Sequence, residues 1–129
     1  MATPREYLND VLDIDGAIGA AVVDYDLGIT LGSTGGGSID MERAGAGNTR
    51  FVLSNLDALN RSGIDEPVED LLVTLENQYH LTRFSEAHET IFTYLILNRE
   101  EANLALARRQ LASLESTLQL DGSAGDGLS

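Results

Sequence analysis

Two stretches of the chain, residues 17–25 and 90–97, carry apolar side chains on both of their alternating faces. An extended strand of this kind has no polar face to present to water, so other elements must cover it from both sides. This requirement excludes a two-layer fold in which one face of the sheet is wet. It places both segments at the centre of a sheet that lies between two layers of helices.

The first and last helices have recognisable start signals. Residues 3–6 combine a threonine cap, a proline at the first helical position and a glutamate three residues after the cap, and we expect this helix to stop near Gly16. Asn98 is the predicted cap of the last helix, with Glu101 at its capping-box position. The apolar stripe of that helix consists of Leu104, Ala107, Leu111, Leu114 and Leu118.

A long helix is predicted between them. Ser38 or Asp40 caps it, and it runs to about Arg61. Gly45 and Gly47 in one turn of this helix predict that another backbone comes close there, because glycine is otherwise costly in a helix. The inner face predicted from helical spacing consists of Met41, Gly45, Asn48, Val52, Leu56 and Leu59.

Three shorter strand patterns complete the sheet. Residues 29–32 follow the turn signal at residues 26–28 and predict the second strand of a hairpin. Residues 70–76 and 79–84 are joined at residues 77–78, which predicts another hairpin. The fold class is therefore α/β (α+β): a three-layer sandwich with a five-stranded, mainly antiparallel sheet between one long helix and two terminal helices, in the order α-β-β-α-β-β-β-α.

The length of 129 residues corresponds to one domain. We assign residues 1–119 to it and expect the Gly- and Asp-rich residues 120–129 to form a disordered tail. The formal net charge is −13, and all 8 basic residues are arginine, so nucleic acid is not expected as a partner. There is no apolar run of membrane-spanning length and no secretory signal pattern, so we expect no direct membrane insertion and a cytoplasmic location.

The residue types that carry most catalytic chemistry are missing or isolated. Cysteine and lysine do not occur, which excludes thiolate and Schiff-base chemistry. We expect His80 to be half-buried and structural and His88 to be exposed in a loop, each without the neighbours that a metal site needs. Residues 13–16 fail the calcium-loop pattern, and residues 32–37 predict a mobile loop rather than a phosphate cradle. We therefore predict no catalytic residue, metal site or cofactor, and no enzymatic activity.

The outer face of the long helix is the least expected feature of so acidic a chain. Arg43, Arg50 and Arg61 lie within about 20° of one another on it. Small residues beside them would let a partner approach closely, and arginine is enriched in interface hot spots. The alternative is a solvated face on which Asp57 and nearby glutamates pair with the arginines. The predicted partner-binding residues are Arg43, Ala46, Gly47, Arg50, Leu53 and Ser54.

Several segments, in their order and spacing, resemble one known family. They are residues 16–24, 28–32, 44–49, 69–75, 78–81 and 102–108. Together they resemble roadblock/dynein light chain domains, specifically the bacterial MglB-like branch. The resemblance implies a homodimer in which the second helix and an edge strand of each protomer meet their counterparts. It also implies that the chain binds a small Ras-like GTPase as a non-catalytic regulator or scaffold, with a GTPase-activating or adaptor role.

Dimerisation has a physical motive of its own. The strand over residues 70–76 is expected at a sheet edge, and an unpaired apolar edge invites pairing with a second copy. The predicted dimer-interface residues are Phe51, Asn55, Leu71 and Val73.

Two other classes of function stay open at this point. An acidic, dimeric secretion-type chaperone that binds client segments would share the size and charge of this chain. It would have three strands before the long helix, so a further strand near residues 33–40 would favour it. A small-molecule sensor of profilin-like shape would instead need a pocket between the sheet and a helix.

Overall fold

The computed structural model describes residues 1–120, and its elements follow the predicted order. Most of the predicted tail, residues 121–129, lies outside the described residues. The elements are α1 (Pro4–Val11), β1 (Ala17–Asp24), β2 (Ile29–Gly35), α2 (Met41–Arg61), β3 (Asp70–Thr74), β4 (Gln78–Phe84), β5 (Ile91–Asn98) and α3 (Leu104–Glu115).

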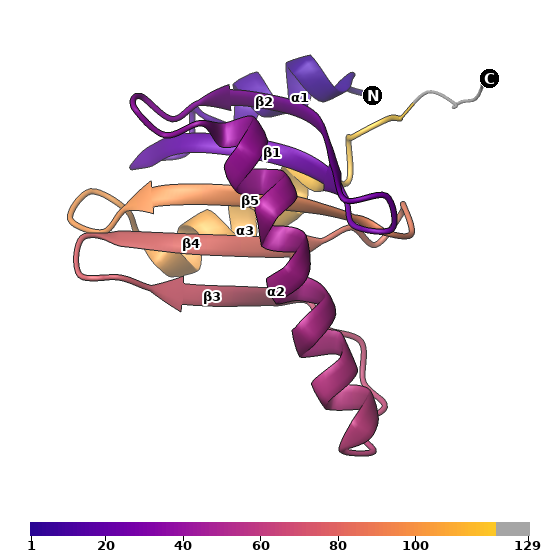
Figure 1. Cartoon of the computed structure of the whole chain (residues 1–129). Helices are drawn as coiled ribbons and strands as arrows, with labels where there is room; N and C mark the ends of the chain where they lie inside the picture. The colour runs from indigo at the N-terminus through magenta and orange to yellow at the C-terminus, as the bar shows by residue number, and fades with distance from the viewer. Residues whose placement is uncertain (121–129) are drawn as a thin grey trace.

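The five strands form one sheet in the order β2-β1-β5-β4-β3, and every neighbouring pair is antiparallel. The two strands that are apolar on both faces, β1 and β5, lie side by side in its interior, as predicted. Helix α2 crosses one face of the sheet, and α1 and α3 cover the other (Figure 1). The predicted three-layer sandwich is therefore confirmed.

Alternate residues of the central strands serve two separate cores. Val22 and Leu95 pack with α1 and α3 on one side, whereas Val23 and Phe92 pack with α2 on the other. The first core also holds Tyr7, whose hydroxyl lies 2.7 Å from the Thr93 hydroxyl. Burial raises the pKa of the Tyr7 phenol, so this group stays neutral and hydrogen-bonded.

Helix α2 is buried against the sheet from Met41 to Val52, and Leu56 packs on the same core while half-buried. Its buried residues are Met41, Gly45, Thr49 and Val52. A Cβ on Gly45 would lie 2.9 Å from Ala21 Cβ, so a close approach occurs there, but to side-chain atoms rather than to the predicted backbone. Nothing lies within 4 Å of the corresponding point on Gly47. The last turns of α2 project past the edge strand β3 (Figure 1).

Two of the three predicted helix starts are confirmed by their hydrogen bonds. Thr3 Oγ1 accepts from the Glu6 amide at 3.2 Å, and Glu6 Oε1 accepts from the Thr3 amide at 3.0 Å, which completes a capping box. Asp40 caps α2 by accepting from the Arg43 amide at 3.1 Å.

The predicted cap of the last helix is wrong. Asn98 still belongs to β5, where it pairs with Gln78, and its side chain accepts from the Glu100 amide in the turn that follows. Asn103 caps α3 instead, by accepting from the Leu106 amide at 3.1 Å. The Glu101 capping box is therefore absent, because strand pairing carries β5 too far for a helix to begin at Asn98.

The glycine-rich segment over residues 32–37 is structured in its first half. The strand predicted over residues 29–32 continues to Gly35, and the Gly36 amide donates to the Ile18 carbonyl at 2.8 Å. Gly35 and Gly36 both have positive φ, which turns the chain sharply toward α2. No third strand follows before α2 in this described segment.

Other element ends differ by a few residues. The strand predicted over residues 70–76 ends at Thr74, and the one predicted over residues 79–84 begins at Gln78. Helix α1 ends before its predicted stop near Gly16. These shifts leave the topology unchanged.

Replacing Leu111 with alanine should lower the free energy of unfolding by about 2–5 kcal/mol, because a fully buried leucine side chain leaves a cavity. Leu106→Ala is the matched control on the same helix, since Leu106 is 38% exposed. Urea unfolding measures both variants. Equal stabilities would show that α3 does not pack on the sheet through Leu111.

Candidate docking surfaces

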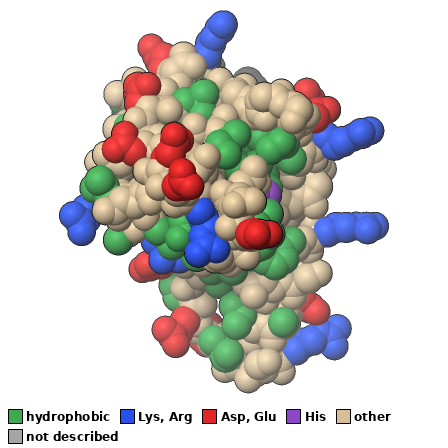
Figure 2. All heavy atoms as spheres, turned by 90° about the vertical axis from the view of Figure 1, so that its left-hand side faces the viewer, with side chains coloured by type: hydrophobic (Ala, Val, Ile, Leu, Met, Phe, Trp, Pro, Cys, Tyr) green, Lys and Arg blue, Asp and Glu red, His purple; other side chains and the backbone are tan. Residues whose placement is uncertain are grey.

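The residues predicted to bind a partner lie on the outside of α2. Arg43, Gly47, Arg50, Leu53 and Ser54 are exposed, and Ala46 is half-buried. Arginine side chains project from the right-hand side of Figure 2, and others from its top and left. The structure thus brings the six residues onto one accessible helix face.

Two of the outer arginines are available for a partner. Arg61 pairs with Asp57 at 2.8 Å, as the solvated-face alternative predicts, but both side chains are largely exposed, so the pair contributes little to stability. Within residues 1–120, neither Arg43 nor Arg50 has an ion pair. Both guanidinium groups are exposed on this face, next to the carboxylates of Asp40 and Glu42, which line the same groove as Arg43.

The groove beside Arg43 joins this face to the β1–β2 hairpin. Arg43 and Ala46 line it together with Ile29 and Thr30 of β2, and its volume is about 500 Å³. The Thr30 hydroxyl donates to the Glu42 carbonyl at 2.6 Å, which ties the strand to the helix at the base of the groove.

Sequence reasoning missed the apolar side of this groove. Ile29, 46% exposed, lines the groove. Leu27 and Leu31, 65% and 40% exposed, lie two positions before and after it on the hairpin turn and the edge strand β2, and Leu31 lines a separate cavity beside α1. Exposed apolar residues on an unpaired strand edge mark a contact surface. The sequence did carry a sign of this, because apolar residues occupy every second position of residues 27–31, in and before a strand at the edge of the sheet.

The predicted dimer-interface residues lie in the middle of α2, where they alternate with Arg50, Leu53 and Ser54, and on β3. Phe51 is 42% exposed, while Asn55, Leu71 and Val73 are half-buried. Hydrophobic side chains are visible on this lower part of the molecule (Figure 2). The Asn55 Oδ1 atom is buried without a hydrogen-bond partner. β3 is an edge strand, as predicted, so one side of its backbone is unpaired within the described sheet.

A row of polar contacts covers the sheet beside this surface. Asn48 donates to the Thr82 hydroxyl at 2.7 Å, and His80 lies between the Tyr94 hydroxyl and Gln78 Oε1, 2.8 Å from each. Burial lowers the pKa of His80, so the imidazole is neutral at pH 7. The expectation that His80 is half-buried is confirmed, and its ring is hydrogen-bonded to two neighbouring side chains.

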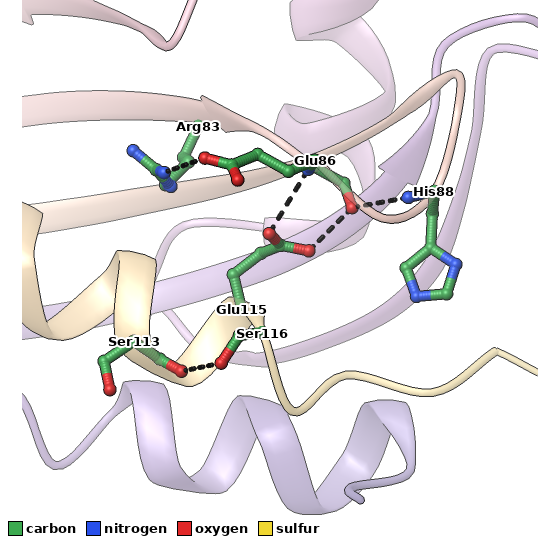
Figure 3. Close-up of polar contacts among 7 residues, drawn as sticks. Arg83, Glu86, His88, Ser113, Glu115 and Ser116 are labelled. Carbon is green, nitrogen blue, oxygen red and sulfur yellow. Dashed lines mark hydrogen bonds and ion pairs between the residues drawn. The ribbon is translucent and has the colours of Figure 1, made fainter.

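The expectation that His88 is exposed is wrong. His88 is half-buried, and its Nε2 atom lies 2.9 Å from the Leu118 carbonyl. Figure 3 shows the loop that it belongs to, which is fastened to the end of α3 by Glu115. The side chain of Glu115 accepts from the Ser85 hydroxyl at 2.6 Å and from the Glu86 amide at 3.3 Å.

This group of side chains is structural rather than catalytic in its geometry. The Ser85 hydroxyl accepts a hydrogen bond from the backbone amide of His88, while the His88 ring is directed to Leu118. The imidazole therefore cannot act as a base for that serine. Among residues 1–120, no group of three or more His, Asp or Glu side chains is placed to hold a metal ion. No helix in the same range is long and apolar enough to cross a membrane.

The element order, the antiparallel sheet and the long helix on one face define the roadblock fold. The chain is similar to a Roadblock/LC7 domain from Streptomyces avermitilis, with a TM-score of 0.75, 15% identity and coverage of 86% of this chain and 90% of that one. It is also similar to Myxococcus xanthus MglB, with a TM-score of 0.69, 14% identity and coverage of 85% and 83%. A structure described as MglB with a tetrameric arrangement has a TM-score of 0.65, 14% identity and 88% coverage of both chains.

No protein-family model matches the sequence, and no curated protein sequence matches it. The likeness to roadblock domains and to MglB therefore lies in the fold. At that level, the resemblance predicted from the sequence is confirmed.

Glu115→Ala should lower the free energy of unfolding by about 1.5–3 kcal/mol, because the Ser85 hydroxyl and the Glu86 amide lose their acceptor. Glu101→Ala, at an exposed position in the turn before α3, is the control and should change it by less than about 0.5 kcal/mol. Thermal unfolding followed by circular dichroism measures both. A stable Glu115→Ala variant would mean that the loop is not held through this carboxylate.

Proposed function

We propose that this chain is a non-catalytic, homodimeric regulator or scaffold that binds a small Ras-like GTPase. The observation that carries the proposal is the outer face of α2, where Arg43 and Arg50 are exposed without an ion pair within residues 1–120, and where Arg43 lines a groove with the exposed Ile29. Apolar residues supply contact area there, and the arginines favour an acidic patch on the partner. The fold likeness to MglB supports this reading, because the MglB-like resemblance of the sequence implies GTPase partners.

The dimer that we propose joins two copies through β3 and the second half of α2. Exposed Phe51, the buried and unpartnered Asn55 Oδ1 atom and the unpaired edge of β3 lie in one region and support this arrangement. A second copy would pair the strand edge and cover the helix in one symmetric contact. The tetrameric arrangement of an MglB structure is a precedent for assembly in this fold.

The two alternatives have less support. A chaperone of the predicted kind needs three strands before the long helix, whereas this chain has two. A profilin-like sensor needs space between the sheet and a helix. Here Val23, Val52 and Phe92, all 0% exposed, fill the space between α2 and the middle of the central strands, and a cleft beside α2 opens only at the end of the sheet, next to Leu56.

Arg50→Glu should weaken binding to the partner GTPase by about tenfold or more, because it places a negative charge on the docking face. Isothermal titration calorimetry with the small GTPases of the same genome, in both nucleotide states, measures the affinity. Arg109→Glu makes the same change of charge at an exposed position of α3, on the opposite layer, and should leave the affinity unchanged. No binding by the folded wild-type chain, or equal affinities for all three proteins, would contradict the proposal.

Phe51→Glu should convert the dimer to a monomer, because it puts a charge into the apolar part of the proposed interface. Sedimentation velocity at micromolar concentration measures the mass. Leu106→Glu replaces a similarly exposed apolar residue on α3 and should leave the dimer intact. A monomeric wild-type chain, or two dimeric variants, would rule out this interface.

A further inference from the structure

A cleft opens on the α2 side of the sheet, at the end where β1 finishes and β5 begins. Its volume is about 360 Å³. Leu56 of α2, Pro67 of the segment before β3, and Phe84 at the end of β4 give it apolar walls, and Tyr25 and Glu89 complete it. It is separate from the groove beside Arg43, since the two share no lining residue.

The aromatic wall of the cleft, formed by Tyr25, packs on a buried ring of the core. The Tyr25 ring stacks on Phe92 with a centroid distance of 6.2 Å, and Phe92 is fully buried. Phe84 meets Tyr25 edge-on, with a centroid distance of 6.0 Å and an interplanar angle of 83°. Tyr25 is itself half-buried, so it offers a fixed aromatic surface to the cleft.

Negative charge surrounds this ring. The pKa of Tyr25 is raised, first by burial and then by the carboxylates of Glu89, Asp24 and Asp26. The Asp24 carboxylate already has a hydrogen-bond partner within the chain, since its Oδ1 atom accepts from the Asp26 amide at 2.9 Å. Glu89 is exposed, lines the cleft, and has no hydrogen bond or ion pair from its side chain within residues 1–120.

The loop that carries Glu89 is fixed on both sides. The Thr90 carbonyl accepts from the Tyr25 amide at 2.8 Å, and Thr90 itself has φ of 64°, a conformation that β-branched residues rarely adopt. The start of the same loop is fastened to α3 through Glu115 (Figure 3). The cleft is thus preformed rather than assembled by a ligand.

We propose that this cleft receives the side chain of an arginine from a partner protein. Its aliphatic part would lie against Leu56 and Pro67, and the guanidinium would stack on Tyr25 while Glu89 accepts its hydrogen bonds. Arginine fits better than lysine, because its planar group both stacks on an aromatic ring and presents paired donors to a carboxylate. The contact is opposite in charge to the arginine face of α2 and does not rest on the proposed GTPase binding.

Titration of the ¹⁵N-labelled chain with a capped peptide, acetyl-Gly-Ser-Leu-Arg-Leu-Ser-Gly-amide, tests the proposal by NMR. We expect saturable shifts confined to the amides of Tyr25, Phe84, Glu89 and Thr90. The same peptide with citrulline in place of arginine keeps the shape of the side chain and loses its charge. Its affinity should be at least about fivefold lower.

Glu89→Gln should reduce the affinity for the arginine peptide about fivefold without unfolding the chain, because Glu89 is exposed. Glu100→Gln, at another exposed glutamate, is the matched control, and Arg50→Glu should leave this binding unchanged. Equal binding of the two peptides, shifts spread over the acidic surface, or no saturable shift at millimolar peptide would each overturn the proposal.

Discussion

The close approach of α2 to β1 at Gly45 fixes the position of the whole helix. With hydrogen in place of a side chain, the helix backbone can lie directly on Ala21 and Val23. A helix of 21 residues is about 31 Å long, and its fully buried residues end at Val52. The second half must therefore continue beyond the strands that it covers, past β3 (Figure 1).

This position gives the two ends of α2 different surroundings. Near its start, the outer arginines stand next to the β1–β2 hairpin and share a groove with it. In its middle, Phe51 and Leu53 are exposed, and its last turns pass the edge strand β3 (Figure 1). The residues proposed for the partner and those proposed for the dimer are therefore neighbours on one helix, since Arg50, Leu53 and Ser54 alternate with Phe51 and Asn55.

The architecture could be predicted because it follows from patterns that are local in the chain. Strands that are apolar on both faces require cover from two sides, and the caps at Thr3 and Asp40 are signalled within four residues of sequence. Asn98 and Asn103 illustrate the limit. Either asparagine could cap the last helix. Because Asn98 pairs with Gln78 of β4 and so belongs to β5, the helix begins after Asn103.

The candidate sites were predicted less completely, since they depend on contacts between remote segments. Glu115 is buried because its acceptor atoms serve Ser85, 30 residues away, whereas its position in a helix suggests only a solvated glutamate. The helix face with Arg43 and Arg50 could be predicted from the helical spacing of the sequence. The apolar hairpin beside it and the cleft at Tyr25 could not, because each is formed by elements that meet only in the folded chain.

Hydrogen exchange at the β3 backbone tests most directly whether the chain works as a symmetric docking unit. The amides of β3 that point away from β4 have no partner in the described sheet. If two copies pair through this edge, these amides exchange slowly at high protein concentration and become fast on dilution below the dissociation constant. Fast exchange of the same amides at every concentration would contradict the account.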